Sequence, residues 1–259
     1  MKLSSKLLLI SSCVFFTQFN FAQSNCDKAI DLFYKRCDKA VGLKADSTII
    51  NKAIALFEAE IKNKTANEWC WVHYFESLNF KARFVLTDDS KKKILLSKAE
   101  KLELECLKKY PTSGPLIFEY ITSVGLKAEI AGVLEAATSG VVDKIKTYAT
   151  KLIQVDSMYN SGAGWKVLGI MHYRTPHIPL IISWPDKLYA KKILERSLSY
   201  FPKDIANNFY YAEALLENDE KEKAKIYFNN VMKLTCREKY LLDDVEFKVK
   251  AAKYLSDLK

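Results

Sequence analysis

The chain has 259 residues and a formal net charge of +9, and it contains only eight glycines and six prolines. Leu, Ala, Lys, Glu and Ile dominate, which indicates a helical protein with room for one large domain or a run of repeats. The lysines alternate with glutamates as on solvated helix faces, and the five arginines after residue 22 are scattered. A nucleic-acid groove needs clustered arginines with aromatic residues between them, so we expect no nucleic-acid partner.

Residues 1–22 are predicted to be a secretory signal peptide. Two lysines precede an apolar stretch from residue 7 to 21, and Ala22 supplies a small residue for cleavage. We therefore expect a periplasmic mature protein that starts at Gln23, with a net charge of +7 because two lysines and no acid leave. A second interpretation is a lipoprotein signal that ends at Cys13 and anchors the protein to the membrane.

Behind the leader, one helical pattern recurs five times. Each copy has a small or apolar residue and a second apolar residue eight positions later. Four positions after that, four copies have Pro, Thr or Ser, and the last has Cys236. A small residue in the middle of a helix allows a neighbouring helix to pack closely, and a terminal proline ends the helix. The copies start at intervals of 46, 46, 45 and 34 residues, and the last interval is the length of a tetratricopeptide repeat (TPR). The first positions are Ala53, Ala99, Ile145, Ala190 and Ala224.

A further amphipathic segment precedes each of these helices, so the helices pair into hairpins. The sequence predicts an all-α domain over 23–259, an array of about five TPR-like hairpins with a C-terminal capping helix. The extra dozen residues of the longer intervals should lie between the two helices of a hairpin or in longer first helices. The predicted first helices cover 26–41, 67–84, 115–136, 164–173 and 207–219, and the cap covers 237–259.

Residues 159–234 resemble the T-component (TatT) family of TRAP transporters. The resemblance implies a periplasmic accessory protein of solute uptake that works beside a substrate-binding protein and a membrane permease and holds an apolar ligand. The chain departs from the family pattern at residues 183–186, where a pair of glycines is expected. The matching residues are Tyr159, Gly162, Gly164, Leu168, Gly169, Pro176, Pro179, Ala190, Leu198, Ala212 and Glu213.

The segment from Arg174 to Asp186 is the predicted ligand or partner site. It is apolar, and its three prolines prevent it from joining a helix. Large apolar side chains cost about 1.5–3 kcal/mol each when left in water, so these must pack on the protein, on a ligand or on a partner. A loop that fills a gap in the array remains an alternative. The predicted site residues are Tyr173, Ile178, Leu180, Ile182 and Trp184, with Trp165, His172, Asn208 and Tyr211 from the adjacent first helices.

No catalytic, phosphate-binding or metal-binding motif occurs, so we expect neither an enzyme nor a cofactor. The function that the resemblance implies is an accessory protein of TRAP-type uptake. The alternative is a periplasmic TPR scaffold for protein–protein interaction, and self-association also stays open. Five cysteines follow the leader, and none forms a CxxC motif. Cys70 and Cys106 lie on neighbouring predicted helices and could form a disulfide, whereas Cys26 and Cys37 are too far apart on one predicted helix. The alternative is that the cysteines are buried core residues.

Overall fold

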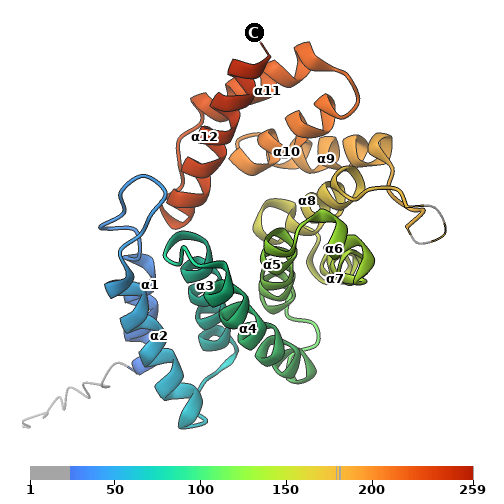
Figure 1. Ribbon diagram of the computed structural model, residues 1–259. Coiled ribbons are helices and arrows are strands. Elements are labelled where there is room, and N and C mark those ends of the chain that lie inside the picture. Colours follow the sequence, from blue (N-terminus) through green and yellow to red (C-terminus); the bar gives the residue numbers. More distant parts are fainter. Residues whose placement is uncertain (1–23, 179, 181, 259) are drawn as a thin grey trace, which may run out of the picture.

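The computed structural model describes residues 24–178, 180 and 182–258. These residues form twelve α-helices and one 3₁₀ turn, and their only β-type pairing is two isolated bridges (Figure 1). The all-α prediction is therefore confirmed. The predicted leader, its cleavage after Ala22 and the alternative anchor Cys13 lie outside the described residues. None of the described helices has the length and apolar character that crossing a membrane requires.

The helices pair into five hairpins, as predicted. The first three are α1 (Asn25–Tyr34) with α2 (Ser47–Lys62), α3 (Glu68–Phe84) with α4 (Asp89–Lys109), and α5 (Gly114–Ala131) with α7 (Val141–Asp156), with the short α6 (Val133–Thr138) between the last two. The other two are α8 (Tyr159–Arg174) with α9 (Lys187–Tyr200), and α10 (Ile205–Leu216) with α11 (Lys221–Lys233). A 3₁₀ turn (Glu238–Tyr240) then leads into α12 (Leu241–Asp257).

The extra length of the early hairpins takes a different form in each. The first hairpin has a long connection, the second has long helices, the third contains α6, and the fourth has the apolar insert at residues 175–186. Two predicted helices are shorter than expected. The segment 115–136 breaks at Gly132, whose φ of 93° interrupts the helix. The helix predicted over 26–41 ends at Tyr34, where the Arg36 side chain donates a hydrogen bond to the Phe33 carbonyl. Cys37 therefore lies in a turn and not on the helix of Cys26.

Sequence signals at the helix starts explain much of this layout. Seven helices begin after a Ser, Asp or Asn whose side chain accepts a hydrogen bond from a backbone N–H of the first turn, which satisfies a donor that the helix cannot pair. These N-caps are Ser24, Asp46, Asn67, Asp88, Ser113, Asp186 and Asp204.

Close packing between paired helices depends on the predicted small residues. Ala53, Ala99, Ala190 and Ala224 are completely buried. On the facing helix α8, a Cβ added at Gly169 would lie 2.5 Å from the Leu194 side chain of α9. Only glycine permits that approach, which confirms the predicted TPR-like contact between these two helices.

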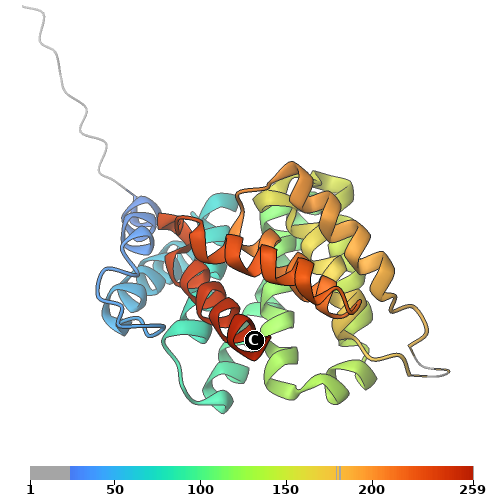
Figure 2. The same cartoon turned by 90° about the horizontal axis from the view of Figure 1, so that it is seen from above.

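The hairpins follow a closed curve, and α12 returns toward the start of the array (Figures 1 and 2). One buried cluster joins α1 to α5, α7 and α8 and also includes Ile193 of α9 and Leu242 of α12, and a second joins α8 to α12. Arg36 donates a hydrogen bond to the Lys239 carbonyl, and the Lys239 ammonium lies 3.3 Å from Glu76 of α3. The C-terminal segment therefore caps the last hairpin and also contacts the first two.

Candidate functional site

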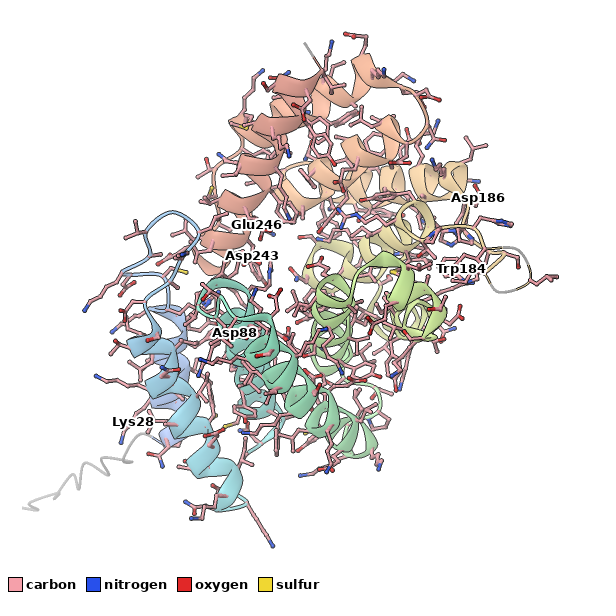
Figure 3. All side chains as sticks on the ribbon, viewed as in Figure 1. Lys28, Asp88, Trp184, Asp186, Asp243 and Glu246 are labelled. Atoms are coloured by element: carbon pink, nitrogen blue, oxygen red, sulfur yellow. The ribbon has the colours of Figure 1, made fainter. Side chains whose placement is uncertain are left out.

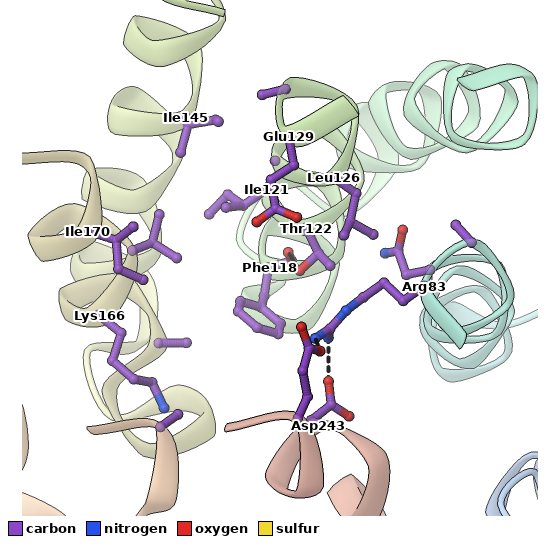
Figure 4. Close-up of a pocket in the computed structure, with 18 of the residues that line it drawn as sticks. Arg83, Phe118, Ile121, Thr122, Leu126, Glu129, Ile145, Lys166, Ile170 and Asp243 are labelled. Carbon is purple, nitrogen blue, oxygen red and sulfur yellow. Dashed lines mark hydrogen bonds and ion pairs between the residues drawn. The ribbon is translucent and has the colours of Figure 1, made fainter. Parts of the chain in front are cut away.

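The first helices and α12 surround a central cavity of about 790 Å³ (Figure 4). Its walls come mainly from α3, α5, α8, α10 and α12, with contributions from α1, α4, α6 and α7. In a TPR array the first helices form the concave face, and the return of α12 turns this face into a cavity. The cavity is the product of the curved array and not of any one repeat.

One side of the cavity is apolar. Phe118 and Leu126 of α5 and Ile170 of α8 point into it from facing walls (Figure 4), and all three remain only partly buried. Gly125 lies between them on α5, and a Cβ added there would meet no atom within 4 Å. Further apolar residues on this side are Ile121, Val142, Ile145, Val167 and Met171.

The other side is charged, and several of its charges form ion pairs. Arg83 of α3 reaches across to α12, where it forms an ion pair with Asp243 and a second one with Glu246 at 2.6 Å (Figure 4). Lys166 of α8 is buried, and its ammonium lies 3.0 Å from the Asn160 carbonyl and 3.5 Å from Asp204. Burial lowers the pKa of Lys166, and the nearby Asp204 offsets only part of this effect.

The turn that carries Asn160 leads into the main part of α8. Asn160, Ser161 and Gly162 have left-handed backbone angles, with φ of 43°, 57° and 75°. Side chains hold this strained backbone in place. Lys166 donates a hydrogen bond to the Asn160 carbonyl, and Asn207 of α10 donates one to the Ser161 carbonyl. This turn positions Lys166 at the cavity wall.

Behind the α5 wall, a buried hydrogen-bonded chain joins Glu103, Ser123, Asn79 and Glu119. The Asn79 amide donates to Glu119 at 3.0 Å, and the Ser123 hydroxyl lies 2.8 Å from Asn79 Oδ1 and 2.7 Å from Glu103 Oε1. The hydroxyl has one proton, so when Asn79 receives it, Glu103 must be the donor in the second contact. Burial raises the pKa of Glu103 to about 8, and burial with the nearby Glu76 raises the pKa of Glu119.

The insert lies on a different part of the surface. Ile178, Ile182 and Trp184 pack with Val142 and Ala137 of the third hairpin, and Ile182 is 1% exposed. Figure 3 shows Trp184 and Asp186 at the edge of the molecule, away from Asp243 and Glu246. Thr175 and Pro176 line the cavity, so the segment starts at the cavity wall and then passes to the outside.

Polar contacts also hold Trp184 in place. Its Nε1 donates to Asp143 at 2.8 Å, and the Lys146 ammonium lies 4.2 Å from its ring centroid. The His172 ring forms edge contacts with Trp184 and with Tyr189, at centroid distances of 5.1 and 4.7 Å. The structure therefore brings together His172, Ile178, Ile182 and Trp184.

The other predicted site residues lie apart from this group. Leu180 is fully exposed at the tip of the insert, and the Arg196 guanidinium lies over the Trp165 ring. Tyr173, Asn208 and Tyr211 are buried and bond to Glu213, to the Pro202 and Asp204 carbonyls, and to Glu195, respectively. None of the nine predicted residues lines the central cavity. Their role in binding stays a prediction.

Sequence reasoning did not identify the cavity residues, although one signal was available. Glu119 and Glu129 interrupt residues 116–137, the most apolar stretch after the predicted leader, and both prove to line the cavity. Within residues 24–178, 180 and 182–258, no group of three or more His, Cys, Asp or Glu side chains is arranged to hold a metal ion.

Comparisons with known proteins identify the fold. No family model matches the chain, and no curated protein matches it by sequence. The crystal structure of a thermophilic TPR protein from Thermus thermophilus is similar, with a TM-score of 0.61, 12% sequence identity, and coverage of 90% of this chain and 97% of the other. This chain therefore has a TPR-like helical-repeat fold, an architecture that typically builds concave binding surfaces.

Proposed function

We propose that this protein is a non-catalytic binding protein that encloses a mainly apolar small molecule in its central cavity. The observation that carries the proposal is the set of partly buried apolar side chains around that space, such as Phe118, Leu126 and Ile170. A volume of about 790 Å³ is within the usual range for small-molecule sites. The charged side, with Lys166 and Arg83, would orient a polar group of the ligand.

A more specific form of the proposal is an exported accessory protein of TRAP-type solute uptake. Its support is the resemblance of residues 159–234 to the T-component family, together with an apolar cavity of the kind expected for such a protein. In that role the protein would pass its ligand to, or receive it from, a periplasmic substrate-binding protein and a membrane permease.

The alternative is a TPR scaffold that binds a segment of another protein, which the fold likeness favours. In such scaffolds the concave face is the usual docking surface. Here α12 crosses this face, and Arg83 ties it to α3 through Asp243 and Glu246. A small molecule can occupy the remaining space with the array closed, whereas a helical segment would have to displace α12.

Gly125 offers a direct test because its missing side chain opens onto the cavity. We expect Gly125→Phe to fill the apolar side and to weaken the binding of an apolar fluorescent probe, anilinonaphthalene sulfonate, by at least about tenfold. Native mass spectrometry of the same samples should show a co-purified molecule in the wild type that the variant lacks. The matched control is Gly125→Ala, which makes the same backbone change without filling the space, and which should bind like the wild type.

Circular dichroism melts show whether each variant is folded at the assay temperature. Equal probe binding by folded Gly125→Phe and wild type would mean that the cavity is not the site. Probe binding that is insensitive to Gly125→Phe but lost in a Trp184→Ala variant would favour the insert instead. Capture of a partner protein that survives Gly125→Phe would favour the scaffold function.

A further inference from the structure

Cys26 and Cys70 meet where the first hairpin packs on the second. Cys26 lies in the first turn of α1 and Cys70 in the first turn of α3, and their exposed fractions are 9% and 0%. Both belong to the same buried cluster, and each thiol shifts the pKa of the other, so the two side chains are neighbours. Because α1 packs on α3, these neighbouring cysteines in the first turns of the two helices are candidates for a disulfide.

No other described cysteines make such a pair. Cys37 lies in the turn after α1, close to Leu242 of α12. Cys106 lies on α4 among Glu103, Glu105 and Lys109. Cys236 follows α11 and packs with the second buried cluster. The Cys70–Cys106 pairing that the sequence allowed is therefore not the one that the geometry favours.

We propose that Cys26 and Cys70 form an intramolecular disulfide that ties α1 to α3 when the chain folds in the presence of a disulfide oxidant. The bond would enclose the rest of α1 and all of α2 in one loop. A crosslink over a loop of this kind restricts the unfolded chain and so favours the folded state. It would hold the terminal hairpin, which supplies Phe33 and Arg36 to the cavity, against the body of the array.

The chemistry is a two-electron oxidation. The Sγ–Sγ bond forms as the two thiols lose two protons and two electrons, and the electrons reduce the disulfide of the oxidant, such as oxidised glutathione or a thiol–disulfide oxidoreductase, to two thiols. Burial raises the pKa of both Cys26 and Cys70 above the ordinary value near 9. The thiolates that react are therefore scarce once α1 has packed on α3, and the bond should form during folding.

The test is a count of thiols after oxidative refolding. The full chain is unfolded and reduced, refolded in a glutathione redox buffer, denatured again and treated with a maleimide. We expect two fewer maleimide additions by intact mass before reduction than after it, and a disulfide-linked peptide that contains Cys26 and Cys70. Equal numbers before and after reduction, or a linked peptide that joins Cys70 to Cys106, would overturn the proposal.

Serine variants assign the bond independently. In Cys26→Ser and in Cys70→Ser the difference of two additions should disappear, whereas in Cys106→Ser it should remain. A loss of the difference in Cys106→Ser would contradict the assignment. The refolded wild type should also melt at a higher temperature than the same protein with reductant, and Cys26→Ser should melt at one temperature under both conditions.

Discussion

The insert after α8 and the central cavity are both apolar regions, but they differ in what their side chains contact. In the insert, Ile182 is 1% exposed, and Trp184 is fixed by Asp143 and Lys146. In the cavity, Phe118 and Ile170 are only partly buried and face open space. The difference teaches that an apolar loop need not be a binding site. What marks a site is apolar surface that the fold itself leaves uncovered.

The largest effect should come from the buried acid behind the cavity wall. Glu103 has a pKa of about 8 when folded, because burial disfavours its charged form. A pKa raised on folding gives stability that is complete below the unfolded value of about 4.5 and is lost as pH rises toward 8. At about 1.4 kcal/mol per unit, the wild type should lose on the order of 5 kcal/mol of unfolding free energy over this range.

The Glu103→Gln variant isolates this contribution, since its amide still donates to Ser123 and carries no charge. Urea unfolding at pH 5 and pH 8.5 should show similar stability for the two proteins at the lower pH and a clear advantage for the variant at the higher pH. Glu105→Gln, an exposed change on the same helix, should keep the wild-type slope. Parallel slopes for the wild type and Glu103→Gln would show that Glu103 is ionised in the folded protein.

The same contrast explains how far sequence reasoning reached. The hairpins were predictable because small residues, caps and helix ends are local signals, as at Ala190 and Asp88. The cavity was not, because it depends on contacts between distant segments. Arg83 meets Asp243 across 160 residues, and Arg36 meets Lys239 across 203, and no periodicity records such pairs. The sequence of the insert indicated which apolar side chains had to be buried. It did not indicate that they would pack on Val142 and Ala137.

A mutation within the insert should have the next largest effect. Ile182→Ala removes a completely packed side chain, and we expect a loss of about 2–4 kcal/mol in unfolding free energy. Leu180→Ala is the matched control, because Leu180 is fully exposed in the same loop, and its loss should stay within about 0.5 kcal/mol. Chemical denaturation measures both. If the two variants lost equal stability, Ile182 would not be packed as described.

Probe binding by Ile182→Ala distinguishes the two regions further. At a temperature where the variant is folded, anilinonaphthalene sulfonate should bind as it does to the wild type, because Ile182 does not line the cavity. Weaker binding by the folded variant would instead make the insert part of the site, as the sequence suggested.

The smallest effect should be an acid response of the insert, opposite in sign to that of the cavity wall. Burial lowers the pKa of His172, the nearby Lys146 lowers it further, and Asp186 opposes them. A histidine pKa lowered on folding gives stability that is complete above the unfolded value of about 6.5 and is lost as pH falls below it. The neutral ring would keep its edge contacts with Trp184 and Tyr189, whereas a charged ring in this buried place would not be solvated.

His172→Phe keeps an aromatic ring in this place and removes the proton. Compared with the wild type, it should therefore lose less stability between pH 7 and pH 5, as measured by urea unfolding and by the fluorescence of the tryptophans. His177→Gln is the control, since His177 is exposed in the same insert and should leave the acid response unchanged. An acid response that disappears in His177→Gln and persists in His172→Phe would assign the titration to the exposed histidine. Low pH should therefore lower the unfolding free energy through His172 in the insert region. High pH should lower it through Glu103 behind the cavity wall, so the two ends of the pH range report on different regions.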